Sequence, residues 1–217
     1  LKKSALEVDA DVVYGPDEQE ALFRKVASYM SFIGCVVIRK ACWDERDKVA
    51  YFGSWFVHMG VIFQRPLRHD ALLLHKPYIA IRYGNATWSS RGFEISLFKW
   101  PALIWSFSTF SDNARQSITP REPWTSASRL FILRARGAYG RKEYEKYLRT
   151  GLQSSVMRIV AKTVAVIPGV FTNTALLIYF YMTRPLHVNA EIQLSDLRTS
   201  GFHYRNVAKN LFLRRPA

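Results

Sequence analysis

The stretch that most constrains the fold is 32–63, FIGCVVIRKACWDERDKVAYFGSWFVHMGVIF, in which an apolar run and an aromatic run flank a charged interruption. The apolar run over 33–39 is short, so it predicts a buried strand. In the aromatic run, Ser54 and His58 stand among bulky apolar side chains. On a helix these two residues share a face, because they are four positions apart. Such a histidine is either a core residue with its hydrogen bonds satisfied or part of a functional site.

The elements predicted for the first half alternate between strand and helix. A strand over 11–15 precedes a helix over 17–30, whose first turn is acidic, as the helix dipole favours. The strand over 33–39 follows, and a further strand is predicted over 76–83. Because strands and helices alternate, we expect an α/β fold with a sheet layer.

The second half is predicted to be helical. A polar, proline-rich segment over 111–123 separates the two patterns. We therefore expect an α/β region over 1–115 and a helical region over 116–217. The helices predicted after the last strand are 89–105, bent at Pro101, and then 124–136, 141–149, 152–167, 173–182 and 191–198.

The charge of the chain points to an anionic partner. The sequence has 31 Lys and Arg against 17 Asp and Glu, a net charge of +14. From Arg129 to the end there are 15 basic residues and 4 acidic ones, so most of the surplus lies in the second half. Nucleic acid, phospholipid head groups or a phosphorylated substrate would each fit such a surplus.

Two segments of the second half bear on membrane contact. The apolar run 164–182 is interrupted by Pro168, its neighbouring glycine and three polar residues, so it is too short to span a bilayer. The segment 152–167 predicts a helix with an apolar stripe, and Arg158 and Lys162 lie off that stripe. This pattern is typical of a helix at a membrane surface, although packing in a helical bundle produces a similar stripe.

The densest polar cluster follows the last predicted strand. Arg82 stands at the end of that strand, and Asn85, Trp88 and Arg91 come after it. Guanidinium groups match phosphate oxygens, an amide both donates and accepts, and an indole offers a flat face to a sugar ring or base. The cluster is a candidate ligand site, and the alternative is a turn with solvated arginines.

His58 is the candidate catalytic residue, because an imidazole titrates near neutrality and can accept a proton. The alternative is a core histidine bonded to a backbone carbonyl. Asp9 and Asp11 come nearest to a metal-binding pair, since two carboxylates can hold Mg²⁺ or Mn²⁺ against a diphosphate. However, they precede their strand, whereas ligand sites in open α/β sheets gather beyond the carboxyl ends, so a solvated strand entrance is the alternative.

Several sequence signatures are absent. The chain holds no P-loop, GxGxxG, GxSxG, HExxH or paired CxxC motif, and no mark of a common nucleic-acid-binding module. Its cysteines, Cys35 and Cys42, form no disulfide framework, which suits a reducing cytosol. The chain begins at Leu1 rather than at a methionine, so one interpretation is a fragment of a longer protein.

In order and spacing, several segments resemble the second half of a GT-A-fold (Rossmann-like) glycosyltransferase of family two, within the abequosyltransferase-like group of surface-polysaccharide enzymes. No single segment is specific to the family, and the resemblance rests on the order and spacing of the segments along the chain. The segments are 10–15 (ADVVYG), 32–40 (FIGCVVIRK), 51–61 (YFGSWFVHMGV), 81–88 (IRYGNATW) and 162–181, with its IPG and N-x-x-L-L-I-Y patterns.

The resemblance implies an inverting transfer of a sugar from a nucleotide-sugar donor to a lipid-linked or oligosaccharide acceptor. This reaction would take place in the cytoplasm, peripheral to the inner face of the cell membrane. In such enzymes a carboxylate usually serves as the base, and here a histidine occupies about that place. The residues that the resemblance places in the site are His58 as base, Ser54 and Trp55 at the acceptor, and Arg82, Asn85 and Arg91 at a diphosphate or phosphate.

The resemblance also implies what the chain lacks. A divalent metal, Mg²⁺ or Mn²⁺, is expected, with its main ligands in a donor-binding half that would precede Leu1. The chain alone would then be inactive. The rival interpretation is a non-catalytic module that binds nucleic acid or anionic lipid through its C-terminal arginines, with nucleic acid the less favoured of the two.

Overall fold

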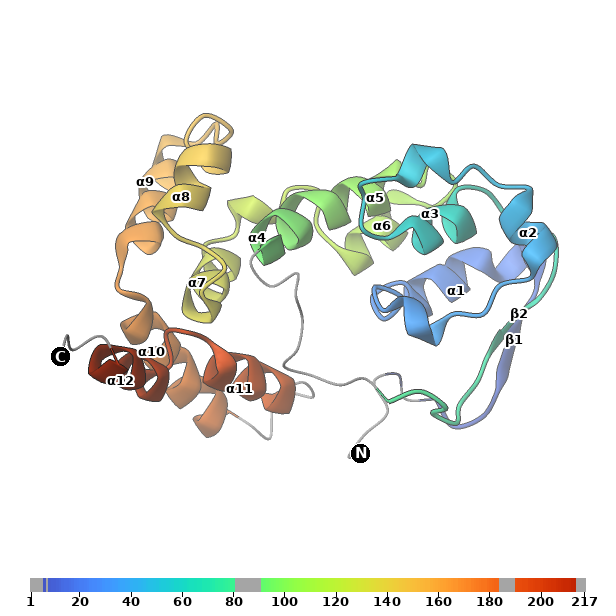
Figure 1. Ribbon diagram of the computed structural model, residues 1–217. Helices are drawn as coiled ribbons and strands as arrows, with labels where there is room; N and C mark the ends of the chain where they lie inside the picture. Colours follow the sequence, from blue (N-terminus) through green and yellow to red (C-terminus); the bar gives the residue numbers. More distant parts are fainter. Residues whose placement is uncertain (1–5, 7, 81–90, 184–189, 214–217) are drawn as a thin grey trace. The chain divides into compact units, whose positions relative to one another are not determined.

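The computed structural model describes residue 6 and residues 8–80, 91–183 and 190–213 (Figure 1). These residues are mainly helical and contain one small sheet of two antiparallel strands. The chain divides into two compact units, which are described separately. The first unit comprises Leu1–Arg82 and Glu94–Glu122, and the second comprises Tyr83–Phe93 and Pro123–Ala217.

The sheet differs from the expected Rossmann-like layer. Strand β1, Val12–Tyr14, confirms the strand predicted over 11–15. Its partner is β2, Ala71–Leu73, which the sequence patterns did not indicate, with Val13 opposite Leu72 (Figure 1). The strand expected over 76–83 is not formed at residues 76–80, and residues 81–83 lie outside the described part of the chain.

The buried strand predicted over 33–39 is wrong. The segment begins with a short 3₁₀ turn, Ile33–Cys35, and continues as extended backbone without a strand partner. Val36 and Ile38 pack against the core of the first unit, whereas Val37 is fully exposed. Apolar residues in a sequence indicate burial, but they do not show whether the segment pairs with another strand. Here alternate residues of an extended segment reach the core without joining a sheet.

The first unit is built from short helices around aromatic side chains. Phe23 stacks on Phe110 with ring centroids 4.2 Å apart and meets Phe63 edge to face at 5.1 Å. Each buried ring contributes about 1.5–3 kcal/mol by its removal from water. The helical elements of this unit are Pro16–Glu18 (3₁₀), α1 Gln19–Val26, α2 Lys40–Asp44, Val49–Tyr51 (3₁₀), α3 Val57–Phe63, α5 Trp100–Ser106 and α6 Asp112–Ile118.

The helix predicted over 89–105 is confirmed over its described part, and its irregularity has a local cause. It runs from α4, Gly92–Glu94, through a π-helical segment, Ile95–Lys99, into α5. Pro101 lies at the start of α5, where its ring cannot donate a hydrogen bond and crowds the carbonyl one turn earlier. A π-helical stretch is one way in which a helix accommodates that disturbance.

All regular elements of the second unit are helices within its described residues, as predicted. Asn173 joins three of its helices, because its buried amide donates to the carbonyl oxygens of Ala135 in α7 and Leu197 in α11, both at 2.9 Å. The elements of this unit are Pro123–Thr125 (3₁₀), α7 Ala127–Arg136, α8 Arg141–Glu143, a π-helical segment Tyr144–Leu148, α9 Ser155–Val166, α10 Gly169–Met182, α11 Ala190–Thr199 and α12 Tyr204–Leu213. Only α12 was not expected.

Within the described ranges, no single helix is long and apolar enough to cross a membrane. Helices α9 and α10 reach that length and composition only as a pair, and the chain bends by 97° between them. The bend falls next to Pro168, which cannot continue the helix that precedes it.

Candidate functional site

The segment between Tyr51 and α3 forms a tight loop that determines how the site residues are presented. Gly53 has a φ of 79°, in the left-handed region that glycine adopts without strain. Ser54 stabilises the loop locally, because its hydroxyl donates to the Tyr51 carbonyl at 2.6 Å and accepts from the Phe56 N–H at 3.1 Å. The Ser54 hydroxyl therefore serves the fold of the loop.

Trp55 occupies an unusual position in this loop. Its φ is 73°, a backbone conformation that a bulky residue adopts only at a cost of about 1–3 kcal/mol. Even so, its side chain is not buried in return, since 47% of it is exposed. A strained tryptophan that keeps much of its surface in solvent is the kind of outlier found at binding sites.

His58 lies in the first turn of α3 and is buried, with 6% of its surface exposed. Its Nε2 lies 2.5 Å from the carbonyl oxygen of Met30. A carbonyl only accepts hydrogen bonds, so Nε2 carries the hydrogen and Nδ1 is the ring atom left to accept a proton. This geometry matches the core histidine of the alternative interpretation, and it is also how a backbone carbonyl fixes the tautomer of a catalytic histidine.

Glycine is required at position 60 of α3 because a ring packs directly against the helix. A Cβ at Gly60 would lie 2.1 Å from the Tyr51 ring, so no larger residue fits without displacing that ring. Burial is the main cause that raises the pKa of the Tyr51 hydroxyl, and the nearby charge of Asp47 adds to it. The contact fixes the loop against the helix that carries His58.

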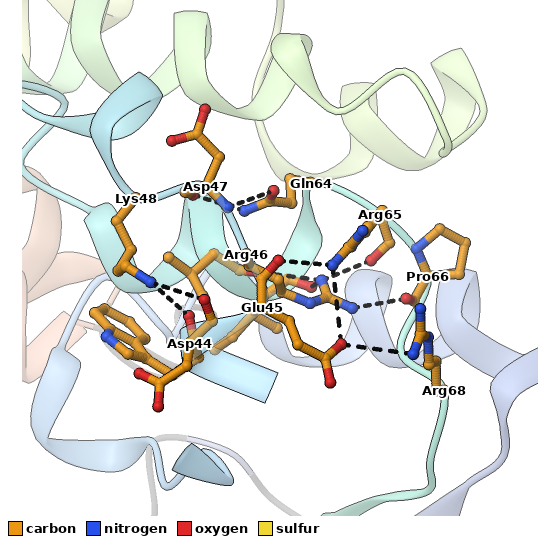
Figure 2. Close-up of polar contacts among 12 residues, drawn as sticks. Asp44, Glu45, Arg46, Asp47, Lys48, Gln64, Arg65, Pro66 and Arg68 are labelled. Carbon is orange, nitrogen blue, oxygen red and sulfur yellow. Dashed lines mark hydrogen bonds and ion pairs between the residues drawn. The ribbon is translucent and has the colours of Figure 1, made fainter. Parts of the chain in front are cut away.

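Arg46 anchors the other end of α3, and the sequence patterns missed it. Figure 2 shows its guanidinium directed at the end of the helix, where it donates to the carbonyls of Val61, Ile62, Arg65 and Pro66 at 2.7–3.0 Å. The side chain is 5% exposed, and burial lowers its pKa. A cation suits this place because the last carbonyls of a helix lack partners and carry partial negative charge.

A second layer of polar contacts surrounds Arg46. The Gln64 amide donates to the Asp47 carbonyl at 2.9 Å and accepts from the Asp47 N–H at 3.2 Å (Figure 2). Glu45 lies 3.6 Å from Arg68, an exposed ion pair of small energetic value. The charged interruption that separates the two apolar runs in the sequence is therefore a structural clamp on α3.

The other residues predicted to bind substrate lie outside the described residues or in the second unit. Arg82, Asn85 and Trp88 lie outside the described residues. Arg91 is exposed and belongs to the second unit, whereas Ser54 and His58 belong to the first. Their common role at a phosphate stays a prediction.

Of the two weak metal candidates, Asp11 takes part in other contacts. Asp11 accepts hydrogen bonds from the backbone N–H of His75 at 2.8 Å and from its ring at 2.7 Å, which link the ends of β1 and β2. These bonds, the backbone one foremost, lower the pKa of Asp11. Asp9 is exposed. In the described ranges no three His, Cys, Asp or Glu side chains converge as metal ligands.

Two arginines of the basic run after Arg129 support the fold of the second unit. Arg134 donates to the carbonyls of Ile167 at 2.9 Å and Tyr139 at 3.0 Å. Arg136 pairs with Asp196 at 3.1 Å. These contacts join α7 to the α9–α10 bend and to α11, so neither side chain is a freely available anion site.

Comparisons of the chain with protein-family models, with curated proteins and with solved structures gave no match. The resemblance to family-two glycosyltransferases therefore stays a prediction from the residues quoted for it. The function has to be argued from the chemistry of the described side chains.

Proposed function

We propose that the chain forms the acceptor side of an inverting glycosyltransferase with a partial GT-A-like domain. It would move a sugar from a nucleotide-sugar donor to a lipid-linked or oligosaccharide acceptor in surface-polysaccharide synthesis. The observation that carries the proposal is the strained, half-exposed Trp55, which lies in the loop three residues before His58. An indole held in this way offers a rigid flat face, on which the apolar side of a sugar ring can stack.

The chemistry assigned to this loop is a direct displacement. The acceptor hydroxyl oxygen forms a bond to the anomeric carbon, while the bond from that carbon to the donor diphosphate breaks and its electron pair leaves with the diphosphate. The acceptor proton passes to a base, and Nδ1 of His58 is the atom assigned to take it. The hydrogen bond from Nε2 to Met30 supports this role, because it keeps Nδ1 unprotonated in the neutral ring.

The proposal places this reaction in the cytoplasm, at the inner face of the cell membrane. Support comes from the net charge of +14 and from the exposed apolar side chains of α9 and α10. A divalent metal belongs to the family's chemistry, but the described residues supply no site for it, and no step here is assigned to it.

The test of His58 uses a substitution that keeps its hydrogen bond. In His58→Gln the amide N–H can still donate to the Met30 carbonyl, but the side chain cannot take a proton. We expect kcat to fall by about 100-fold or more, since general bases contribute about 10²–10⁴-fold. The assay is release of nucleoside diphosphate by the full-length protein from UDP-, GDP-, dTDP- and CMP-sugars (nucleoside monophosphate for the last), with bacterial membrane lipid as acceptor.

The test of Trp55 separates binding from chemistry. Trp55→Ala should raise KM for the acceptor about tenfold, a loss of about 1.4 kcal/mol, with little change in kcat. Tyr29→Ala is the matched control, because Tyr29 is an aromatic residue of the same unit with 43% exposure. An unchanged kcat in His58→Gln would show that His58 is a structural core residue and not the base. Absence of nucleotide release from every donor would contradict the proposed function as a whole.

A further inference from the structure

One face of α10 is apolar and exposed along its whole length. Phe171, Ile178 and Met182 are 70%, 55% and 79% exposed, and with Ala175 they follow the helical spacing of four, three and four residues. The opposite face, which includes Leu177 and Phe180, packs in the core of the second unit. The helix is therefore apolar on both sides, although only one side has a protein partner in the described structure.

Helix α9 shows the same arrangement on a smaller scale. Val156, Ile159 and Val166 are 72%, 67% and 46% exposed and lie on one side of the helix, whereas Val164 is buried. The single stripe expected from the sequence is therefore divided between the core and the surface. No charged residue occurs in the sequence between Lys162 and Arg184, so the exposed apolar surface of α10 has no charge within it.

A basic groove lies next to this surface, among α10, α11 and α12 of the second unit. It has a volume of about 530 Å³, and Ile178 and Tyr181 of α10 form part of its wall. The three helices lie together in Figure 1. The remaining lining residues are Thr174, Leu177, Arg198, His203, Tyr204, Arg205 and Asn206.

The cations of the groove contact tyrosines and not carboxylates of the described residues: Arg198 donates a hydrogen bond to the Tyr181 hydroxyl, and Arg205 donates one to the Tyr204 hydroxyl at 3.1 Å. The guanidinium of Arg198 lies 5.4 Å from the centroid of Tyr181, and that of Arg205 lies 5.7 Å from the centroid of Tyr204. Within the described part of the chain, neither guanidinium forms an ion pair. Two arginines that line one groove without a carboxylate partner among the described residues favour an anion, and guanidinium groups match phosphate oxygens best.

We propose that this groove binds the phosphate of an anionic phospholipid while the exposed face of α10 enters the outer acyl layer of the same membrane leaflet. Ile178 belongs both to the groove wall and to the apolar face, so a phosphate and an acyl chain of one lipid find adjacent sites. A free phosphate or a nucleic acid would account for the arginines but not for the apolar face beside them. The inference rests on the membrane-surface part of the proposed function and is independent of the sugar-transfer step.

The test is binding of the full chain to vesicles, without any sugar donor. Vesicles of phosphatidylcholine and phosphatidylglycerol in equal parts are compared with pure phosphatidylcholine at 0.1 M salt. Arg198→Gln with Arg205→Gln should weaken binding to the anionic vesicles by about 20- to 30-fold, since each basic residue near such a surface contributes about fivefold. Binding to pure phosphatidylcholine should change little.

The matched control removes the same charge elsewhere in the second unit. Arg141 and Lys142 are exposed and have no side-chain hydrogen bond or ion pair to described residues. Because these two residues do not line the groove, Arg141→Gln with Lys142→Gln should weaken binding by less than about threefold. An equal loss in both double variants would overturn the proposal, because net charge alone would then explain binding.

The apolar half of the proposal has its own variants. Phe171→Ser with Met182→Ser should weaken binding to both kinds of vesicle by about tenfold or more, because two side chains lose their transfer into the acyl layer. Ile33→Ser with Val49→Ser, at apolar positions of the first unit with 63% and 71% exposure, is the control and should leave binding unchanged. Unchanged vesicle binding in the α10 variant would overturn insertion of this helix.

Two further outcomes distinguish other anions from lipid. If 10 mM inorganic phosphate raises the melting temperature through Arg198 and Arg205 while vesicle binding is indifferent to both, the groove is a free-phosphate site and the proposal fails. If a single-stranded RNA oligonucleotide binds through these arginines and vesicles do not, the rival nucleic-acid module is supported instead. Neither result would affect the release of nucleoside diphosphate assayed for the proposed function.

Discussion

The two units of the chain differ in how they use their polar and cationic side chains. The first unit buries both His58 and Arg46 and bonds them to backbone carbonyls, although it leaves other side chains such as Phe52 at the surface. The second unit leaves apolar side chains of α9 and α10 at the surface and keeps Arg198 exposed beside them. A buried cation with carbonyl partners is part of the folded structure itself. Exposed apolar and cationic groups that lie together imply that another molecule binds to them.

The contrast between Arg46 and Arg198 shows this difference most clearly. Arg46 meets four carbonyl oxygens and is 5% exposed, so its hydrogen-bonding capacity is used inside the protein. Arg198 stands over a tyrosine ring at the wall of a groove. Substitution of the first should therefore cost stability, and substitution of the second should cost binding.

The largest effect is expected for Arg46→Met, which would leave the carbonyls at the end of α3 without their donor. Each buried acceptor left without a partner costs about 1–3 kcal/mol, so unfolding free energy should fall by about 3 kcal/mol or more. Urea denaturation measures the loss. Arg68→Met is the control, since Arg68 forms only an exposed ion pair with Glu45, and a similar loss there would show that Arg46 is not a clamp.

Gly60→Ala should have the next largest effect, because its Cβ would lie 2.1 Å from the Tyr51 ring. Displacing a packed ring costs about 1–3 kcal/mol, and the loop that carries Trp55 should loosen with it. Thermal unfolding and hydrogen exchange over residues 51–60 measure both effects. Gly15→Ala, where the nearest atom is 3.7 Å away, is the control. Equal melting temperatures for the two variants would contradict the packing described for α3.

Asn173→Ala extends the comparison to the second unit, where a buried amide donates to backbone carbonyls as Arg46 does in the first unit. We expect a loss of about 1–2 kcal/mol, because the Leu197 carbonyl loses its donor while the amide oxygen, already without a partner, is also removed. Faster hydrogen exchange in α7, α10 and α11 would report the loss. Gln153→Ala, at an exposed position, is the control. Unchanged protection would mean that Asn173 does not join these helices.

The smallest effect is expected at the exposed Asp11–His75 contact. Because the pKa of Asp11 is lowered in the folded chain, the contact stabilises above the unfolded value of about 3.9 and is lost as pH falls through the lower folded value. Asp11→Asn should therefore lower the melting temperature at pH 6 but not at pH 2. Asp9→Asn is the control. A difference that persists at pH 2 would show that the carboxylate charge is not the cause.

The sequence predicted α1, α5 and most helices of the second unit, because helical periodicity and capping are local. It did not predict α2, or α6, which lies within the polar segment 111–123. It failed at 33–39, where a short apolar run looked like a buried strand, and at β2, because a three-residue strand carries too short a pattern to be recognised. In the site, Ser54 and His58 could be singled out as polar groups in an apolar run. Their hydrogen bonds could not, since the Met30 carbonyl lies 28 residues away in sequence.

Arg46 is a second residue whose role could not be predicted from the local sequence. In the sequence it is one charge within a solvated interruption, and nothing local indicates that it is buried. Its carbonyl partners are 15–20 residues distant, and only the folded chain brings them together. The groove residues of α11 and α12 were missed for this reason as well, because their common wall is a tertiary feature.

The central claim is that an acceptor sugar stacks on Trp55, and fluorine NMR of the full-length protein labelled with 5-fluorotryptophan tests it directly. Trp55→Phe assigns the Trp55 signal among those of the chain's 6 tryptophans. On addition of a polyprenyl diphosphate-linked disaccharide, we expect the Trp55 signal to shift in a saturable manner. A Trp55 signal that stays unchanged while the same sample transfers sugar would contradict the account.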